Sequence, residues 1–250
     1  MIFFNYEIIA SDYDGTFNRN GITEYKKEML SKWRKAGNLF GIISGRGYPS
    51  LMECIESHPF EYDFLVCNNG GVIYNTDGKI MFEARCDGSN ARPFVEDLFL
   101  WGCPMAHIDK DIPIRIVNTT DPIDDDEIYL SDLPEIEYFN QISTYLETVE
   151  DAANIVKKIE DKYSHILTPL QNGNCIDIVP IGVNKAQGLY SLLEVMGGTY
   201  DDIIAVGDDI NDTHMIAEFR SYAMENGVDS IKALADYIVK DITEVMNKEI

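Results

Sequence analysis

Short apolar runs separated by one helical segment constrain the fold of this chain more than any other feature. Strand-like runs occur near residues 6–10, 39–43 and 63–67. Between the first two, residues 23–37 place apolar side chains at helical spacing, with Thr23 at the expected N-cap and Gly37 at the expected stop. A strand, a helix and a second strand at this spacing indicate a βαβ unit and therefore a parallel sheet.

The middle of the chain breaks this rhythm. Asp77-Gly78 predicts a hairpin turn between two short apolar runs. From residue 83 to about 182, the pattern is that of a self-contained α+β unit, with helices and strands expected near 93–101, 112–117, 140–147, 150–163, 165–171 and 175–180. The strand–helix alternation then returns. We predict an α/β fold whose doubly wound, mainly parallel core (1–82 and 183–250) is split by an inserted α+β domain (83–182).

Net charge and cysteine content restrict the binding partners and the cellular compartment that we expect. The net charge of −23 argues against a nucleic-acid or anionic-membrane surface, because phosphate groups would be repelled. The acidic run at 124–127 is expected at a solvated helix N-terminus. The five cysteines form no C-x-x-C pair, which favours reduced thiols in a cytoplasmic protein. The apolar start lacks the basic leader and cleavage site of a signal peptide.

Carboxylates follow the predicted strands directly. Asp12 and Asp14 come after the first strand, Ser44 after the second, and Asp208 with Asp209 after a late strand. Open parallel sheets bind ligands beyond the carboxyl ends of their strands. Hard carboxylate oxygens suit Mg²⁺, while Lys185, at the start of a predicted helix, and Ser44 offer donors for phosphate oxygens.

The spacing of the first pair suggests a division of roles. Asp12, at the strand tip, can attack phosphorus and also bind the metal. Asp14, two residues on, projects to the same side but further out, where a leaving-group oxygen would lie. Two carboxylates in one site rarely ionise alike, so one can remain a proton donor. Gly15 and Thr16 allow the tight turn that follows.

Four ordered motifs resemble those of the haloacid dehalogenase superfamily: DYDGT at 12–16, SGR at 44–46, Lys185, and GDDIND at 207–212. Further matches (NNGG at 68–71, NDTHM at 211–215, AMENG at 223–227) are similar to its Cof-type sugar-phosphatase branch. The resemblance implies a Rossmann-like core and makes the inserted domain a cap that sets substrate specificity.

The resemblance also implies roles for single residues. Asp12 would be the nucleophile that forms an aspartyl-phosphate, and Asp14 the general acid/base. The metal would be held by Asp12, Asp208 and the main-chain oxygen of Asp14. Ser44 and Lys185 would bind the phosphate, and Asn211 with Asp212 would hold Lys185, the phosphate or metal-bound water. Beside the resemblance, we list Gly45 and Arg46 as candidate substrate- or phosphate-binding residues, and we expect Asp209, which points away from Asp208, to support the site rather than bind the metal.

Some positions keep two interpretations. Arg46 could clamp substrate or pair with a surface carboxylate, and Asn69 with Gly70 could touch substrate or only make a turn. Two stretches depart from the family pattern. Phe17 replaces the usual Leu and is followed by NRNG, and IVKDITE (238–244) replaces a Gly-containing C-terminal motif.

The sequence thus predicts a Mg²⁺-dependent phosphatase acting on a small phosphorylated metabolite, with a sugar phosphate favoured by the resemblance. A phosphomutase is the closest alternative, and a receiver-like phosphoacceptor without enzymatic activity is a more distant one. We expect a small-molecule substrate, no nucleic-acid or membrane partner, and a monomer or small homo-oligomer. Candidate specificity residues in the cap are Arg115, Tyr145, Asn172 and Asn174.

Overall fold

The computed structural model describes residues 6–250, which form two compact units. Of the described residues, one unit contains 6–82 together with Asn184–Ile250, and the other contains Glu83–Val183. We call them the core unit and the inserted unit. Within residues 6–250, no helix combines the length and apolar character needed to cross a membrane.

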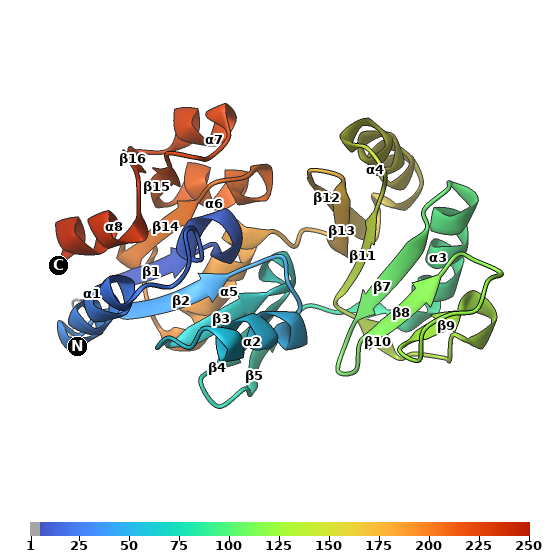
Figure 1. The fold of residues 1–250 in the computed structure, drawn as a ribbon, viewed down its shortest axis with the longest axis horizontal. Helices are drawn as coiled ribbons and strands as arrows, with labels where there is room; N and C mark the ends of the chain where they lie inside the picture. Colours follow the sequence, from blue (N-terminus) through green and yellow to red (C-terminus); the bar gives the residue numbers. More distant parts are fainter. Residues whose placement is uncertain (1–5) are drawn as a thin grey trace. The chain divides into compact units, whose positions relative to one another are not determined.

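The core unit is built on an eight-stranded sheet (Figure 1). In spatial order its strands are β16 (Tyr237–Val239), β15 (Arg220–Met224), β14 (Ile203–Gly207), β1 (Ile8–Ser11), β2 (Leu39–Ile43), β3 (Phe64–Cys67), β4 (Val72–Asn75) and β5 (Ile80–Glu83). The six strands from β16 to β3 are parallel, and β4 runs antiparallel to β3. The predicted doubly wound, mainly parallel α/β fold is confirmed.

Helices cover both faces of this sheet. One face packs against α1 (Glu24–Lys35), α2 (Tyr48–Ser57) and α8 (Ile242–Glu249). The other packs against α5 (Lys185–Met196), α6 (Thr213–Glu218) and α7 (Asp229–Leu234). The central strands are apolar on both sides because successive side chains alternate between the two layers. In β1, Ile9 faces the first layer and Ile8 the second, and both are fully buried.

Local signals placed the first elements correctly. Thr23 caps α1 and accepts a hydrogen bond from the Lys26 amide, and the helix ends just before Gly37, whose φ is +95°. The expected strand at 39–43 is β2. The expected hairpin joins β4 to β5, where the Asn75 side chain accepts hydrogen bonds from the amides of Asp77 and Lys79.

The inserted unit has a six-stranded sheet of its own. In spatial order its strands are β12 (Leu167–Asn172), β13 (Cys175–Pro180), β11 (Gln141–Tyr145), β7 (Met105–Asp109), β8 (Ile114–Val117) and β9 (Glu127–Tyr129). A separate two-stranded ladder joins β6 (Cys86–Asp87) to β10 (Tyr138–Phe139). The helices α3 (Ala91–Leu100) and α4 (Val149–Tyr163) pack on one face of the larger sheet.

This unit differs from the sequence-based expectation in several strands, since β6, β7, β9 and β10 were not predicted. The central strand β7 was not predicted, because its polar residues His107 and Asp109 interrupt the apolar pattern. The acidic run at 124–127 does not start a helix. Its residues form a turn into β9, closed by the Glu127 amide on the Asp124 carbonyl, and the Arg115 side chain pairs with Glu127 there.

The polar face of this sheet contains a buried carboxyl group with no hydrogen-bond donor. Asp109 is 8% exposed, and no described side chain or amide donates to its carboxylate. Burial raises the pKa of Asp109 to about 7, and the neighbouring Asp177 carboxylate adds to the rise. The native state therefore binds more protons than the unfolded state between pH about 4 and 7, so stability should fall as pH rises through this range.

Asp109→Asn is expected to stabilise the protein at pH 8, by at most about 4 kcal/mol, and to change little at pH 4. Urea denaturation at both pH values measures the difference. Removal of an exposed charge by Asp125→Asn is the control and should show no such pH dependence. Equal effects of Asp109→Asn at pH 4 and pH 8 would contradict the assignment.

Candidate active site

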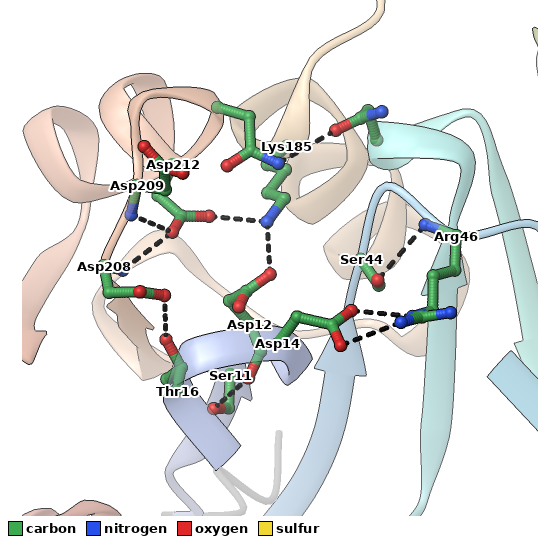
Figure 2. Close-up of polar contacts among 12 residues, drawn as sticks. Ser11, Asp12, Asp14, Thr16, Ser44, Arg46, Lys185, Asp208, Asp209 and Asp212 are labelled. Carbon is green, nitrogen blue, oxygen red and sulfur yellow. Dashed lines mark hydrogen bonds and ion pairs between the residues drawn. The ribbon is translucent and has the colours of Figure 1, made fainter. Parts of the chain in front are cut away.

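The C-terminal ends of neighbouring parallel strands bring the predicted residues together. Asp12 follows β1, Ser44 follows β2, and Asp208 follows β14, which pairs with β1. Figure 2 shows these side chains facing a common space, with Lys185 reaching in from the start of α5. This is the strand edge at which α/β sheets bind their ligands.

A buried lysine joins two of the aspartates. The Lys185 ammonium lies 2.7 Å from Asp12 Oδ1 and 2.5 Å from Asp212 Oδ1 (Figure 2). Lys185 and Asp212 are fully buried, and Asp12 is 6% exposed. A buried charge of this kind is stable only when it is paired and hydrogen-bonded. No described residue donates to the second oxygen of the Asp12 carboxylate, which is therefore available to a ligand.

Asp212 serves as an anchor. Its Oδ2 accepts hydrogen bonds from the amides of Asp208, at 2.8 Å, and Asp209, at 3.1 Å. Because its Oδ1 binds Lys185, both of its oxygens are in use. Asp209 turns its own carboxylate to the Ile210 amide, at 2.7 Å. Both residues thus organise the loop after β14.

Asp208 is held from two sides. Its Oδ1 accepts a hydrogen bond from the Thr16 hydroxyl at 2.6 Å, and its Oδ2 accepts one from the side-chain amide of Asn226 at 3.2 Å. Gly15 makes the close approach possible, since a Cβ at this position would lie 2.4 Å from Asp208 Oδ2 and its φ is +81°. Neither Thr16 nor Asn226 was predicted as a site residue, although Thr16 lies in the DYDGT motif and Asn226 in the AMENG motif.

Asp14 lies apart from the other carboxylates. Arg46 binds it with two hydrogen bonds, Nε to Oδ2 at 2.7 Å and a terminal guanidinium nitrogen to Oδ1 at 2.9 Å (Figure 2). The Asp14 side chain is 52% exposed and that of Arg46 is 37% exposed. The structure shows Arg46 paired with a carboxylate, which was one of its two interpretations. The partner is Asp14, the predicted general acid/base.

The loop after β2 supplies a hydroxyl and a backbone turn. Ser44 is 2% exposed, and its hydroxyl accepts a hydrogen bond from the Arg46 amide at 3.2 Å. Gly45 lies between these two residues. The Asn69 amide donates to the Ser44 carbonyl at 2.9 Å, so Asn69 holds the turn next to the site. The Asn211 side chain donates to Asn69 Oδ1 at 3.4 Å, which places Asn211 next to Asn69.

Burial sets the electrostatics of the cluster. It acts to raise the pKa of Asp12, and the Lys185 ammonium opposes this effect. Burial acts to lower the pKa of Lys185, but Asp12 and Asp212 outweigh it and raise the pKa above the usual value of a lysine. Burial also raises the pKa of Asp208. The carboxylates are thus set close together with one cation, which leaves a deficit of positive charge.

The donor set fits a hard divalent cation. Carboxylate oxygens of Asp12, Asp208 and Asp212 lie within 4.8 Å of one another, and no cysteine or histidine among residues 6–250 belongs to this group. Oxygen-only ligands favour magnesium-type ions over softer metals. Asp12 has an unused oxygen, and each oxygen of Asp208 accepts from one neutral donor. Asp212 instead binds the Lys185 ammonium with one oxygen and two backbone amides with the other. Asp12 and Asp208 are therefore the better candidate ligands.

The candidate specificity residues lie in the inserted unit. The side chains of Tyr145 and Asn172 are exposed. Arg115 pairs with Glu127, with Nε 3.3 Å from Oε1. The Asn174 side chain donates to the Leu146 carbonyl at 2.7 Å, so it stabilises the local backbone.

The fold and the site define the class: an α/β enzyme whose carboxylates and a single lysine meet at the C-terminal edge of a parallel sheet. The chain belongs to the haloacid dehalogenase-like hydrolase family, which matches residues 9–246. It is a phosphatase of this type, similar to the Cof-type branch.

Known proteins agree with this assignment. The chain is 41% identical over 237 residues to a 5-amino-6-(5-phospho-D-ribitylamino)uracil phosphatase of Bacillus subtilis (strain 168), covering 93% of this chain and 89% of the relative. Its fold is similar to that of a haloacid dehalogenase-like hydrolase from B. subtilis (TM-score 0.82, 17% identity, covering 98% and 100% of the two chains). A similar hydrolase from Bacteroides thetaiotaomicron has a TM-score of 0.80 at 21% identity, with 98% and 100% covered.

Proposed function

We propose that this protein is a Mg²⁺-dependent phosphatase that hydrolyses a small phosphorylated metabolite through an aspartyl-phosphate on Asp12. The observation that carries the proposal is the Asp12 carboxylate, fixed by Lys185 on one oxygen and open on the other. A carboxylate held in this way is oriented for attack without needing to reorganise.

In the first step, the free Asp12 oxygen attacks phosphorus, and the bond from phosphorus to the ester oxygen breaks. Asp14 gives its proton to the departing alcohol. In the second step, Asp14 takes a proton from water, whose oxygen attacks phosphorus and releases inorganic phosphate and the Asp12 carboxylate. The Lys185 ammonium and the Ser44 hydroxyl stabilise the negative charge on the phosphoryl oxygens.

A Mg²⁺ ion would be held by Asp12, Asp208 and the main-chain oxygen of Asp14, and it would neutralise phosphate charge. The Arg46 guanidinium binds both oxygens of Asp14, so release of this pair would free the Asp14 carboxylate to turn towards the leaving-group oxygen. Substrate phosphate offers the Arg46 guanidinium an alternative bidentate anion, so substrate binding supplies a reason for that release.

A sugar phosphate remains the favoured substrate class, with specificity set by the inserted unit acting as a cap. The B. subtilis relative is named for 5-amino-6-(5-phospho-D-ribitylamino)uracil, so this compound belongs beside sugar phosphates among the candidates. The decisive experiment measures phosphate release from a panel of phosphorylated metabolites, each with Mg²⁺ and with a chelator. Sugar isomerisation faster than phosphate release, after addition of a bisphosphorylated sugar, would indicate a phosphomutase instead.

Activity is expected to disappear in chelator and to return with Mg²⁺, and Asp208→Asn should lose most of it because one anionic ligand becomes neutral. Asp209→Asn is the matched control. It keeps an acceptor for the Ile210 amide and should retain the metal dependence and most of the activity. Full turnover in chelator, or equal losses in both variants, would contradict the metal assignment.

A further inference from the structure

A second buried lysine lies outside the catalytic cluster. Lys26, on α1, is 2% exposed. Its ammonium donates to three backbone carbonyls, those of Phe17 at 2.7 Å, Arg19 at 3.1 Å and Gly21 at 3.2 Å. Its only carboxylate partner among the described residues is Asp241, at 3.4 Å. An ammonium has three donors, and three carbonyls of one short loop accept from this one.

That loop continues directly from the turn that carries Asp14. The turn spans Tyr13–Phe17, and two backbone hydrogen bonds close it, from the Phe17 amide to the Asp12 carbonyl at 3.1 Å and from the Asn18 amide to the Tyr13 carbonyl at 2.9 Å. Phe17 therefore belongs both to the turn and to the set of carbonyls that Lys26 holds. Inside the turn, the backbone of Asp14 and Gly15 departs from helical geometry. We therefore infer that the hydrogen bonds within the turn are not enough to fix the conformation of these two residues.

A second tie connects the same loop to the C-terminal segment. The Arg19 guanidinium donates to the Lys240 carbonyl at 3.1 Å. Asp241, the partner of Lys26, also caps α8 by accepting from the Thr243 amide at 3.0 Å. The two stretches that depart from the family pattern, at 17–21 and 238–244, thus meet at Lys26. Features that look unrelated in the sequence form one structural device.

We propose that Lys26 is a positioning residue for proton transfer: by fixing the end of the 13–17 turn, it holds Asp14 where the leaving-group oxygen must be protonated. This inference rests on the proposed function. Lys26 touches no reacting atom, and it acts only through the backbone that carries Asp14. Its loss should therefore affect the step that needs a proton more than the attack by Asp12.

The test compares two leaving groups. In Lys26→Met, turnover of an alkyl phosphate should fall at least about tenfold more than turnover of p-nitrophenyl phosphate, whose leaving group needs little protonation, because general acid help is typically about 10²–10⁴-fold. In an Asp14→Asn background, Lys26→Met should add no further selectivity. Lys27→Met, the next residue on α1, removes an exposed lysine that pairs with Glu24 and should leave both rates unchanged.

Hydrogen exchange supplies a readout that is independent of turnover. The amides of Phe17 and Asn18 should exchange faster in Lys26→Met, while those of β3 stay protected. If this variant does not fold, Lys26→Arg carries the same test, because it keeps the charge but cannot place three donors on the same carbonyls.

Equal losses for both substrates, or no loss, would overturn the inference and leave Lys26 with a role in stability alone. The proposed function is judged separately, on the wild-type protein. If the wild type forms no phosphoenzyme with p-nitrophenyl phosphate, the covalent mechanism fails, and the role of Lys26 in it fails too. If the phosphoenzyme forms and the ratio of rates is unchanged in Lys26→Met, only the role of Lys26 is wrong.

Discussion

Asp12→Asn should yield no covalent phosphoenzyme with any substrate and should lose essentially all turnover. An amide cannot form the acyl phosphate, and nothing else among the described residues offers a carboxylate at the same place. The substitution keeps the shape of the side chain and an oxygen for the Lys185 ammonium, now at 2.7 Å from Asp12 Oδ1, so the fold should survive. Intact-mass analysis after mixing with p-nitrophenyl phosphate measures the adduct, and circular dichroism checks the fold.

Asp14→Asn is the matched variant, because it changes the second carboxylate of the same turn. It should still be phosphorylated by the aryl phosphate, and it should then release phosphate slowly because the attacking water has lost its base. The expected record is a burst of aryl product near one equivalent, followed by a steady state about 10²–10⁴-fold slower, equivalent to roughly 3–5 kcal/mol of barrier. With a sugar phosphate the first step should fail too, and no burst should appear.

Two outcomes would contradict these assignments in different ways. A burst from Asp12→Asn and none from Asp14→Asn would mean that the two roles are reversed. The absence of an adduct on the wild type and on both variants would point to direct attack by water, and the aspartyl-phosphate would have to be abandoned.

Lys185→Met is expected to reduce turnover by about 10²–10³-fold, the usual effect of losing one transition-state contact to developing charge. The structure adds a consequence that the sequence did not suggest. Lys185 is the cation between two buried carboxylates, so its removal should also lower stability. Steady-state kinetics and thermal melting of the same preparation measure the two effects.

The double variant Lys185→Met, Asp212→Asn separates stability from catalysis. Without Lys185, the carboxylates of Asp12 and Asp212 lose their buried cation. Replacing Asp212 by asparagine removes one of these two negative charges and keeps an oxygen that can accept hydrogen bonds. Melting should then recover towards the wild-type value, and turnover should stay low. If Lys185→Met stays within a few-fold of wild-type activity, the lysine only neutralises the aspartates. If turnover recovers together with stability, the same conclusion follows.

Much of the core could be read from local pattern. Three kinds of signal depend only on neighbours a few residues away and can therefore be recognised in a single sequence. They are apolar runs of strand length, Thr23 before a helix, and Asp77-Gly78 between two runs. The inserted unit was predicted less well, since β7 carries His107 and Asp109 on its polar face. In β7 apolar and polar residues alternate instead of forming a continuous apolar run, and its five residues are a short stretch in which to detect this alternation.

The sequence by itself determined that this chain forms a parallel α/β core and which carboxylates follow its strands, because both depend on short-range periodicity. Only the tertiary structure decided which groups pair. Lys185 meets Asp12 across 173 positions of sequence, Arg46 takes both oxygens of Asp14, and Lys26 finds Asp241. These partners depend on the order of strands in the sheet and on the packing of helices against it. Strand order is fixed by the burial of whole apolar faces, a cooperative property of the folded chain that no local stretch encodes.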